Sequence, residues 1–409
     1  MPSGRDSTGS SPRRASRSSH SSTGRSLRSA PGRSLRVVSK STRQAQQRAA
    51  ALTRRFWDAL FAVLPVVGRR GHQQAAGKAT ATEMKEYLEL FARGSESAED
   101  VALRKQRYVE LSNGMYDIAT DFYEWGWGPS FHFAIYSGDE TFREAMRRYE
   151  YTLALRLQLQ PGDEVVDLGC GVGGPMRNIA RFARCRVVGV NICDYQVLRG
   201  LRYIEDEGLM GQCSIIKADF MDLPFADHSK DGVYEIEATC HSPDKRKTYA
   251  EAFRVLKPGA RFVGYEWACT PRYDPANAEH RRIRYGIEIG NGLPDTMTTD
   301  EIVQTLQEVG FVVEDAYDAT LLSERPWYSP LTSEGSFQLS GFRHSRLGHY
   351  VTHALVSALE MARIAPKGSA TMSKTLMDGA RDLVAGGKLG IYTPSFFFVA
   401  RKPEASSRA

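Results

Sequence analysis

A glycine-rich turn is the strongest chemical signal in this chain. It reads DLGCGVGGP from Asp167 to Pro175, after an apolar run and before a helical pattern. Glycine lets a backbone approach a bound molecule closely, and proline suits the first turn of a helix. The turn therefore predicts a cofactor site in which Gly169, Gly171 and Gly173 lie against the ligand.

The acid that precedes this turn separates two classes of cofactor. Nicotinamide and flavin sites carry GxGxxG and place a pyrophosphate at the N-terminus of the following helix. Here the spacing is GxGxGG, and Asp167 would repel a pyrophosphate. A carboxylate suits the α-ammonium group of the methionine moiety of S-adenosylmethionine, so the turn favours that cofactor over a dinucleotide.

The ends of the next two predicted strands offer further contacts to the cofactor. Asn191 follows the second strand and is expected to hydrogen-bond the ribose hydroxyls, with Gln196 also within reach. Most methyltransferases that bind S-adenosylmethionine in such a fold carry an acid after the second strand, so Asn191 is a departure from that pattern. Asp219 and Phe220 follow the third strand. Asp219 is expected to accept a hydrogen bond from the adenine amino group, and Phe220 is expected to stack on the adenine ring. A surface aspartate at a strand end is the alternative for Asp219.

Two segments outside the turn combine acids with aromatic residues. Asp121–Phe133 interleaves aromatics, glycines and an acid in a pattern that fits neither a regular helix nor a strand. Tyr234–Pro243 lies at the carboxyl end of the fourth predicted strand and contains Glu235, Glu237 and His241. Glu235 and Glu237 are two positions apart on a strand, so their side chains are expected to point the same way. Ligands of open α/β sheets bind at this edge. These segments predict a second, acceptor site beside the cofactor.

At these segments the chain resembles the sterol 24-C-methyltransferase family. The matching strings run from about Tyr108 to Pro403 and include YEWGWGPSFHF, DLGCGVGGPMRNIARF, NICDYQ, KADFMDLPF, YEIEATCHSPDK and AGGKLGIYTPSFFFVARKP. The resemblance implies methyl transfer from S-adenosylmethionine to C24 of a Δ24 sterol such as cycloartenol, lanosterol or zymosterol. The positions that it associates with sterol binding and catalysis are Tyr123, Glu124, Glu237 and His241.

The implied reaction makes specific demands on the acceptor site. An isolated alkene is a weak nucleophile, so the site must align it with the sulfonium methyl group and exclude water. Attack leaves positive charge on the sterol side chain, which an aromatic face stabilises by roughly 0.5–2 kcal/mol. Glu124 and Glu237 would add electrostatic stabilisation, and Glu124, Glu237 or His241 accepts the proton lost at the end. The candidate aromatic residues, for which core packing is the alternative, are Tyr123, Trp125, Trp127 and Phe131.

Three positions depart from the common pattern of this family. In YGIEIGNGLP, Gly286 and Asn291 stand where many relatives carry acids, which leaves Glu288 as the carboxylate expected to contact the substrate. Trp125 stands where tyrosine is frequent. These departures concern substrate preference and product range. The alternative functions are methylation of another lipid, such as a tocopherol, or non-catalytic lipid binding by the same fold.

The elements that must position these residues alternate between strands and helices. Apolar runs at 165–168, 186–190, 214–217, 232–236 and 261–266 each precede helix signals, and runs at 311–314 and 396–400 supply two more strands. Buried parallel strands linked by helices have this pattern. We predict an α/β fold with a doubly wound, mostly parallel seven-stranded sheet, the Rossmann-like class I methyltransferase fold. The expected organisation is a tail at 1–50, a helical extension at 51–105, a methyltransferase domain at 106–330 and a C-terminal region at 331–403.

Composition excludes several other classes of function. Residues 1–50 hold eleven Lys and Arg residues and a single acid, so this segment has a net charge of about +10. The whole chain has a net charge of +6, which leaves the remainder near −4. A nucleic-acid surface is therefore not expected on the folded part. The six cysteines form no CxxC pair and no ligand-like spacing with histidine, so a reducing compartment and no metal site are expected.

The N-terminus raises the question of location. Residues 1–42 are rich in Ser and Arg, which is typical of a disordered tail and also of organellar transit peptides. A helical pattern at 43–68 is too short in its apolar part to cross a bilayer, so it either lies in a membrane interface or packs on the body. Because sterols dissolve in membranes, we expect peripheral association with the cytosolic face of the endoplasmic reticulum, or with an organelle if the tail is a targeting signal. A homo-oligomer is possible.

Overall fold

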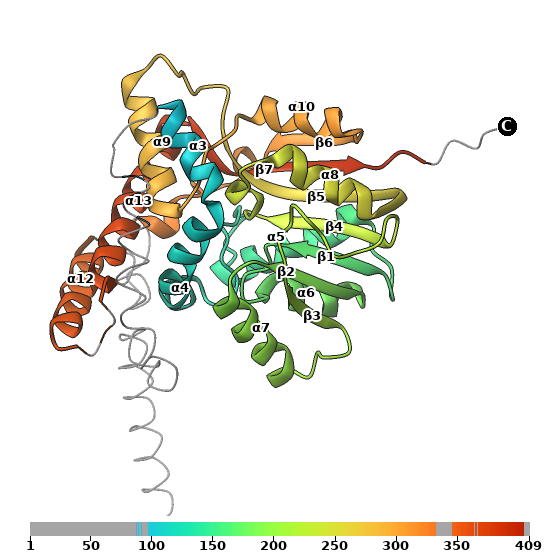
Figure 1. The fold of residues 1–409 in the computed structure, drawn as a ribbon, viewed down its shortest axis with the longest axis horizontal. Coiled ribbons are helices and arrows are strands. Elements are labelled where there is room, and N and C mark those ends of the chain that lie inside the picture. Colours follow the sequence, from blue (N-terminus) through green and yellow to red (C-terminus); the bar gives the residue numbers. More distant parts are fainter. Residues whose placement is uncertain are drawn as a thin grey trace, which may run out of the picture. The chain divides into compact units, whose positions relative to one another are not determined.

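A seven-stranded sheet with the strand order β3-β2-β1-β4-β5-β7-β6 forms the centre of the fold (Figure 1). Neighbouring strands are parallel except at β7, which runs antiparallel to both β5 and β6. The predicted doubly wound, mostly parallel sheet is therefore confirmed. The strands are β1 (Glu164–Leu168), β2 (Arg186–Asn191), β3 (Cys213–Lys217), β4 (Lys230–Ile236), β5 (Leu256–Cys269), β6 (Val312–Asp318) and β7 (Tyr392–Arg401).

This computed structural model describes Tyr87, Glu89, Phe91 and residues 97–332, 346–363, 365 and 367–404. These residues all belong to one compact unit of the chain, Trp57–Ala409. The predictions made for the tail and for the helical pattern at 43–68 lie outside the described residues. Of the helices within the described ranges, none has the length and apolar character needed to cross a bilayer.

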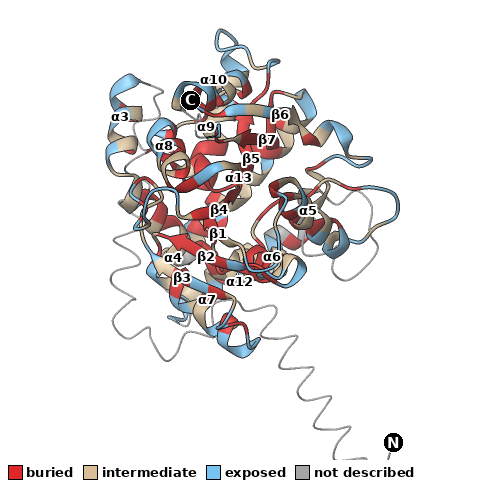
Figure 2. Cartoon of the chain, turned by 90° about the vertical axis from the view of Figure 1, so that its right-hand side faces the viewer, coloured by how far each residue is buried: buried red, intermediate tan, exposed pale blue. Residues whose placement is uncertain are grey.

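Helices cover both faces of the sheet because successive strand residues point to opposite sides. Val165 of β1 belongs to an apolar cluster with α5 (Phe142–Leu157) and α6 (Gly174–Ala183), whereas Val166 belongs to one with α8 (Lys245–Val255) and α10 (Thr299–Val309). Strands buried on both faces need continuous apolar sequence, which explains why the runs could be recognised in the sequence. Figure 2 shows the strands as buried and the outer faces of the helices as exposed.

A group of further helices lies beside the sheet (Figure 1). Among them α13 packs against α9, α4 and α12. Gly290 of α9 and Gly379 of α13 form the closest approach, because a Cβ on Gly290 would lie only 2.3 Å from the Cα of Gly379. The helices of this group are α3 (Ala98–Gln106), α4 (Tyr108–Trp127), α9 (Ala278–Asn291), α12 (Arg346–Met361) and α13 (Ser369–Leu389).

The aromatic segment Asp121–Phe133 differs from its prediction. It is helical as far as Trp127, and α4 ends at Gly128, where φ is +82° and the backbone N–H donates to the carbonyl of Glu124. Gly126 therefore lies within the helix, whereas Gly128 ends it. Helical spacing places Tyr116, Tyr123 and Trp127 near one face, so a regular helix directs these aromatic side chains.

Candidate active site

Two cavities lie at the carboxyl edge of the parallel strands. The smaller one is lined by the segments that follow β1, β2, β3 and β4, together with one face of α4. The larger one is lined by α4, the segment 131–133, β5 and residues of α9, α12 and α13. We call them the cofactor cavity and the acceptor cavity. This edge is where the sequence predicted a ligand.

The glycine-rich turn forms one wall of the cofactor cavity. Gly169 and Gly171 line it with φ values of 72° and 55°, which favour glycine. A Cβ on Gly169 would also lie 2.5 Å from the Cβ of Ala238. Gly173 lies outside the lining and is instead the N-cap of α6, with φ of 74°. It shapes the turn, whereas Gly169 and Gly171 bring backbone up to the cavity.

Asp167 differs from its expected position. It is buried at the end of β1, outside the lining of the cofactor cavity, and Oδ2 accepts a hydrogen bond from the Tyr234 hydroxyl at 2.9 Å. Burial raises the pKa of this carboxyl to about 7, although the Tyr234 hydrogen bond opposes the shift. Its visible contact is therefore with β4, and a direct contact with the α-ammonium group is not part of this geometry.

Asn191 and Gln196 line the cofactor cavity, but their polar atoms are engaged within the protein. The Asn191 amide donates to the Gly171 carbonyl at 3.0 Å and to Gln196 Oε1 at 2.8 Å, while Asn191 Oδ1 accepts from the backbone N–H of Cys193. Gln196 in turn donates to the Thr120 hydroxyl. These bonds explain why an amide replaces the expected acid, since it can both donate and accept. The two side chains brace the turn rather than present free groups to a ribose.

The end of β3 gives the cavity a carboxylate and an aromatic ring, as predicted. Asp219 and Phe220 both line it. Asp219 accepts from the backbone N–H of Met221 at 2.8 Å, and its other oxygen accepts from the Tyr108 hydroxyl. Tyr108 lies on α4 with Ser112 and Tyr116, four residues apart, and all three line the cavity. Sequence reasoning missed these three residues, although their helical spacing was a usable signal.

The cofactor cavity fits S-adenosylmethionine in its chemistry. Positive-φ glycines allow close approach of the backbone at one wall, and Asp219 with Phe220 offers a hydrogen-bond acceptor and a ring for an adenine. Glu237 and Phe131 form part of the lining as well. A sulfonium cofactor is therefore matched by both carboxylates and aromatic faces.

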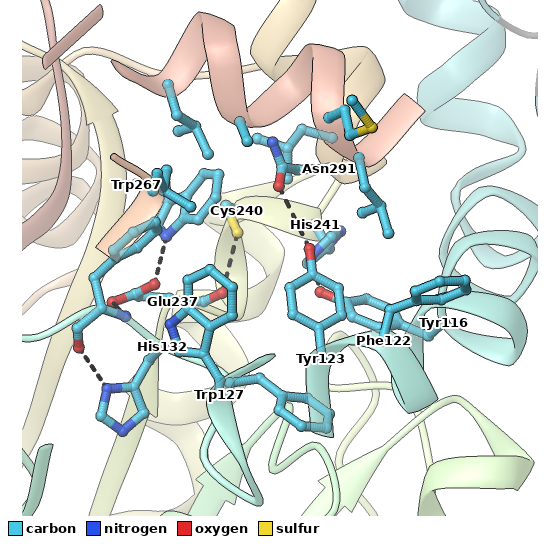
Figure 3. Close-up of a pocket in the computed structure, with 18 of the residues that line it drawn as sticks. Tyr116, Phe122, Tyr123, Trp127, His132, Glu237, Cys240, His241, Trp267 and Asn291 are labelled. Atoms are coloured by element: carbon cyan, nitrogen blue, oxygen red, sulfur yellow. Dashed lines mark hydrogen bonds between the residues drawn. The ribbon is translucent and has the colours of Figure 1, made fainter. Parts of the chain in front are cut away.

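The acceptor cavity is large, and its mainly apolar lining is rich in aromatic residues. It encloses about 1240 Å³, including solvent at its mouth. The ring centroid of Tyr123 lies 6.3 Å from that of Trp127, which Figure 3 shows beside it. It lies 5.5 Å from the ring centroid of Phe131. Burial raises the pKa of the Tyr123 hydroxyl, which lies 3.5 Å from Asn291 Oδ1. Three of the four predicted aromatic residues thus line this cavity, and the side chain of the fourth, Trp125, lies outside the described residues.

Glu237 is the carboxylate of the acceptor cavity. It follows β4 with φ of 56°, so it does not continue the strand, and its side chain diverges from that of Glu235. Oε1 accepts from the backbone N–H of Phe133 and Oε2 from the indole N–H of Trp267, each at 2.8 Å (Figure 3). Burial raises its pKa to about 7, while nearby His132 and the two N–H donors oppose the shift. The expectation that Glu235 and Glu237 point the same way is therefore wrong, because Glu235 instead accepts from the backbone of Ala238.

His132, also in the lining, forms a buried pair with Glu150. Nδ1 lies 2.6 Å from the Phe133 carbonyl and Nε2 lies 3.3 Å from Glu150 Oε1. A carbonyl and an ionised carboxylate both accept, so these two contacts favour the protonated ring. Burial alone would lower the pKa of His132, but the hydrogen bond and charge of Glu150 raise it overall. Sequence reasoning missed this buried pair because Glu150 lies on α5.

Glu124 lies elsewhere than expected. It lines neither cavity, and its carboxylate accepts from the Tyr203 hydroxyl and pairs with Arg199 of α7 (Asp194–Asp206), each at 2.5 Å. Burial raises its pKa, and these two partners oppose the shift. Consecutive residues of a helix point about 100° apart, so Glu124 faces α7 while Tyr123 faces the cavity. A direct electrostatic or proton-accepting role for Glu124 is therefore not supported by this geometry.

Glu288 is also outside both cavities. It is buried on α9, where it pairs with Arg284 at 2.9 Å and Arg104 at 3.7 Å and accepts from the backbone N–H of Thr296. It ties α9 to α3, so this structure does not place Glu288 at the expected substrate contact. Gly286, another departure, has a packing reason. A Cβ there would lie 2.0 Å from Oδ2 of Asp382 on α13.

The two cavities meet at a shared set of residues. His241, in the 3-10 turn η2 (Thr239–His241), lines both, as do residues of α4, of the segment 131–133 and of the segment that follows β4. A donor group in the cofactor cavity and an acceptor in the other can therefore face each other there. The residues that line both cavities are Tyr116, Phe131, Glu237 and His241.

Solved structures with the same fold support this reading of the architecture. The cyclopropane synthase MmaA2 from Mycobacterium tuberculosis has a TM-score of 0.56 and 17% identity, covering 72% of this chain and 98% of that one. The [4+2]-cyclase SpnF has a TM-score of 0.55 and 20% identity, covering 72% and 95%. A methyltransferase-domain model matches residues 166–264. The chain has the fold of the class I methyltransferases.

Closer relatives define the family. The chain is 46% identical to the cycloartenol-C-24-methyltransferase of Arabidopsis thaliana over 325 residues, 80% of this chain and 95% of that protein. It is 48% identical to the sterol 24-C-methyltransferase of Yarrowia lipolytica over 309 residues, 74% and 81% of the two chains. A model described as sterol methyltransferase C-terminal matches residues 339–404. The chain belongs to the sterol 24-C-methyltransferase family.

Proposed function

We propose that this enzyme transfers the methyl group of S-adenosylmethionine to C24 of a Δ24 sterol through a side-chain cation. The observation that carries the proposal is the junction of the cofactor cavity with an aromatic cavity that contains a buried carboxylate, Glu237. The names of the relatives, cycloartenol-C-24-methyltransferase and sterol 24-C-methyltransferase, support the sterol as acceptor.

The chain's own residues supply three things to such a reaction. Bound S-adenosylmethionine provides an electrophilic methyl group. The apolar walls align the alkene and exclude water, which replaces reorganising solvent by fixed groups. The faces of Tyr123, Trp127 and Phe131 and the carboxylate of Glu237 stabilise positive charge on the acceptor. Two N–H donors fix that carboxylate in place before the charge develops.

A panel of acceptors tests this function. The purified protein is incubated with radiolabelled S-adenosylmethionine and with cycloartenol, lanosterol or zymosterol, and the products are identified by mass spectrometry. Matched sterols with a saturated side chain and γ-tocopherol are the controls. We expect label only in Δ24 sterols, as one added carbon at C24. Labelling of tocopherol with none in any Δ24 sterol would overturn the proposal.

We also propose that the enzyme takes its sterol from a membrane surface, that of the endoplasmic reticulum being the expected one. The support is an exposed apolar face on α12, next to Thr352 in the lining of the acceptor cavity. Tyr350, Val351 and Met361 of this helix are 65%, 48% and 80% exposed, and Ala354 and Ala358 between them are exposed as well. Helical spacing puts them on one side, as in interfacial helices.

Sedimentation with sterol-containing phospholipid vesicles tests this proposal. Val351→Glu and Met361→Glu should each reduce vesicle binding and lower kcat/KM for vesicle-borne sterol, while turnover of cyclodextrin-delivered sterol is unchanged. Leu198→Glu is the matched control, because Leu198 on α7 is 62% exposed. Equal losses in the control and in the α12 variants would contradict a specific role of this face.

A further inference from the structure

Tyr116 and His241 form a hydrogen-bonded pair at the junction of the two cavities. The Tyr116 hydroxyl lies 2.8 Å from Nε2 of His241, and the two rings meet edge to face with centroids 5.3 Å apart. Tyr116 comes from α4 and His241 from the turn after β4, and both line both cavities (Figure 3). A bound cofactor and a bound acceptor would therefore both adjoin this pair.

The partners of His241 fix the direction of this hydrogen bond. Nδ1 lies 3.2 Å from the carbonyl oxygen of Gly292, which only accepts, so Nδ1 carries hydrogen. Burial lowers the pKa of His241 to about 4, so the ring is neutral at pH 7 and Nε2 has a free lone pair. The Tyr116 hydroxyl must then donate to Nε2. Its oxygen keeps lone pairs of its own.

We propose that Tyr116 and His241 together accept the proton that the sterol cation loses in the last step. This inference rests on the proposed function. A C–H bond next to the cationic carbon breaks, and its electron pair becomes the new C=C bond. The proton passes to the Tyr116 oxygen as the hydroxyl hydrogen moves to Nε2 of His241. Tyr116 ends neutral and His241 ends as an imidazolium that still donates to the Gly292 carbonyl, so charge is conserved.

A weak base is sufficient for this step. Hydrogens next to a carbocation are strongly acidic, so a neutral phenol backed by imidazole can take one. A weak base also suits the preceding steps, because it adds no further charge to the junction while the methyl group is transferred. The low pKa of His241 then favours return of the proton to solvent after the product leaves.

Glu237 lines the same junction and, with its pKa raised to about 7 by burial, is the competing acceptor of the proton. Both of its oxygens already accept N–H hydrogen bonds, from Phe133 and Trp267 at 2.8 Å. Such charge-assisted bonds favour the ionised carboxylate and weaken when it is protonated. The geometry therefore assigns two different roles to these residues. Glu237 stabilises the cation, and Tyr116 with His241 removes the proton.

Product analysis of Tyr116→Phe tests the inference. This change keeps the ring and removes the relay. In single-turnover experiments with a Δ24 sterol and labelled S-adenosylmethionine, we expect methyl transfer to stay within about 5-fold of wild type. The share of the alkene formed by the wild-type enzyme should fall by roughly 10²-fold, the usual scale of a lost general base. Water-trapped alcohols or alkenes from loss of another proton should take its place.

Two further variants separate a relay from a structural role. His241→Phe removes the acceptor of the Tyr116 hydrogen, and we expect the same change in products. The double variant should show no larger change than either single one, because the two residues act as a unit. Tyr203→Phe, which loses a hydroxyl hydrogen bond to Glu124 outside both cavities, should leave the product ratio unchanged.

The outcomes distinguish this inference from the proposed function. An unchanged product ratio in Tyr116→Phe and His241→Phe, with slower turnover alone, would overturn the relay and leave sterol methylation standing. A wild-type enzyme that labels no Δ24 sterol would instead overturn the function on which the relay depends.

Discussion

The indole N–H of Trp267, in the last part of β5, donates to Glu237, which follows β4, across 2.8 Å. The strands β4 and β5 are adjacent and parallel. Together with the backbone N–H of Phe133, Trp267 holds a carboxylate inside an aromatic cavity. A buried anion of this kind is costly unless it is hydrogen-bonded. Its two donors are what let it persist where a cation is expected to form.

Replacing Glu237 by Gln should lower kcat by roughly 10²–10³-fold, the scale of one lost electrostatic group in a dry site. The cause is loss of negative charge beside the acceptor with nearly unchanged shape. Rapid-quench measurement of methyl transfer checks this prediction. Because both hydrogen-bond partners of the side chain are N–H donors, the NH2 group of the glutamine must face one of these donors. Thermal unfolding of the variant therefore has to show a folded protein, and wild-type kcat in it would refute the charge role.

The pH dependence follows from the raised pKa of Glu237, about 7 against the ordinary 4.5, caused by burial. Activity should fall as pH drops below 7, because the carboxylate becomes neutral.

The stability of the folded protein should change in the opposite sense. The folded state binds this proton more tightly than the unfolded state, so the stability from this group is present below pH 4.5 and is lost as pH rises through 7. Asp167, with a pKa raised to about 7, acts in the same direction. The rate profile and the melting temperatures from pH 5 to 9 check both trends, and a flat activity profile would contradict the first.

Trp267→Phe should move the acid limb of that rate profile upward by about one pH unit. The variant keeps an aromatic ring but removes one hydrogen bond to a charged group, worth about 1.5–3 kcal/mol. The expected result at pH 7 is a several-fold lower kcat that recovers at pH 9. Trp327→Phe is the matched control. Trp327 is buried against Phe133 and lines neither cavity, so the rate profile of this variant should stay in place.

Glu124→Gln should act on stability rather than on products. Gln can still accept from Tyr203, but the ion pair with the partly exposed Arg199 is lost. Exposed pairs contribute only about 0–1 kcal/mol, so a fall of roughly 2 °C in Tm is expected. Product distribution from a Δ24 sterol should equal that of wild type. A changed product ratio would show that Glu124 acts on the cation in spite of its position.

Gly290→Ala should separate α9 from α13. The new Cβ would lie 2.3 Å from the Cα of Gly379, and backbone cannot yield as a side chain does. Overpacking of this kind costs about 1–3 kcal/mol. Because Asn291 and several α13 residues line the acceptor cavity, KM for the sterol should rise as well. Gly211→Ala, where an added Cβ meets nothing within 4 Å, is the control for denaturant unfolding and kinetics.

The sequence by itself determined the fold and the kind of cofactor. Strands buried on both faces need unbroken apolar runs, and a turn such as Gly169 to Gly173 needs residues without a Cβ, so both leave a direct trace in the sequence. The family resemblance added the sterol. It also brought out Tyr123, Trp127, Phe131, Glu237 and His241, all of which line the acceptor cavity.

Only the tertiary structure decided which polar side chains face the ligands. Neighbouring residues of α4 point in different directions, so Tyr123 faces the cavity while Glu124 faces Arg199. Glu288 binds two arginines from separate helices, and Asn191 is occupied by Gln196. Tyr116 gains its importance from His241, which is 125 positions away. Hydrogen bonds and ion pairs between distant segments depend on how helices pack on the sheet, and a local pattern of residue types does not contain that information.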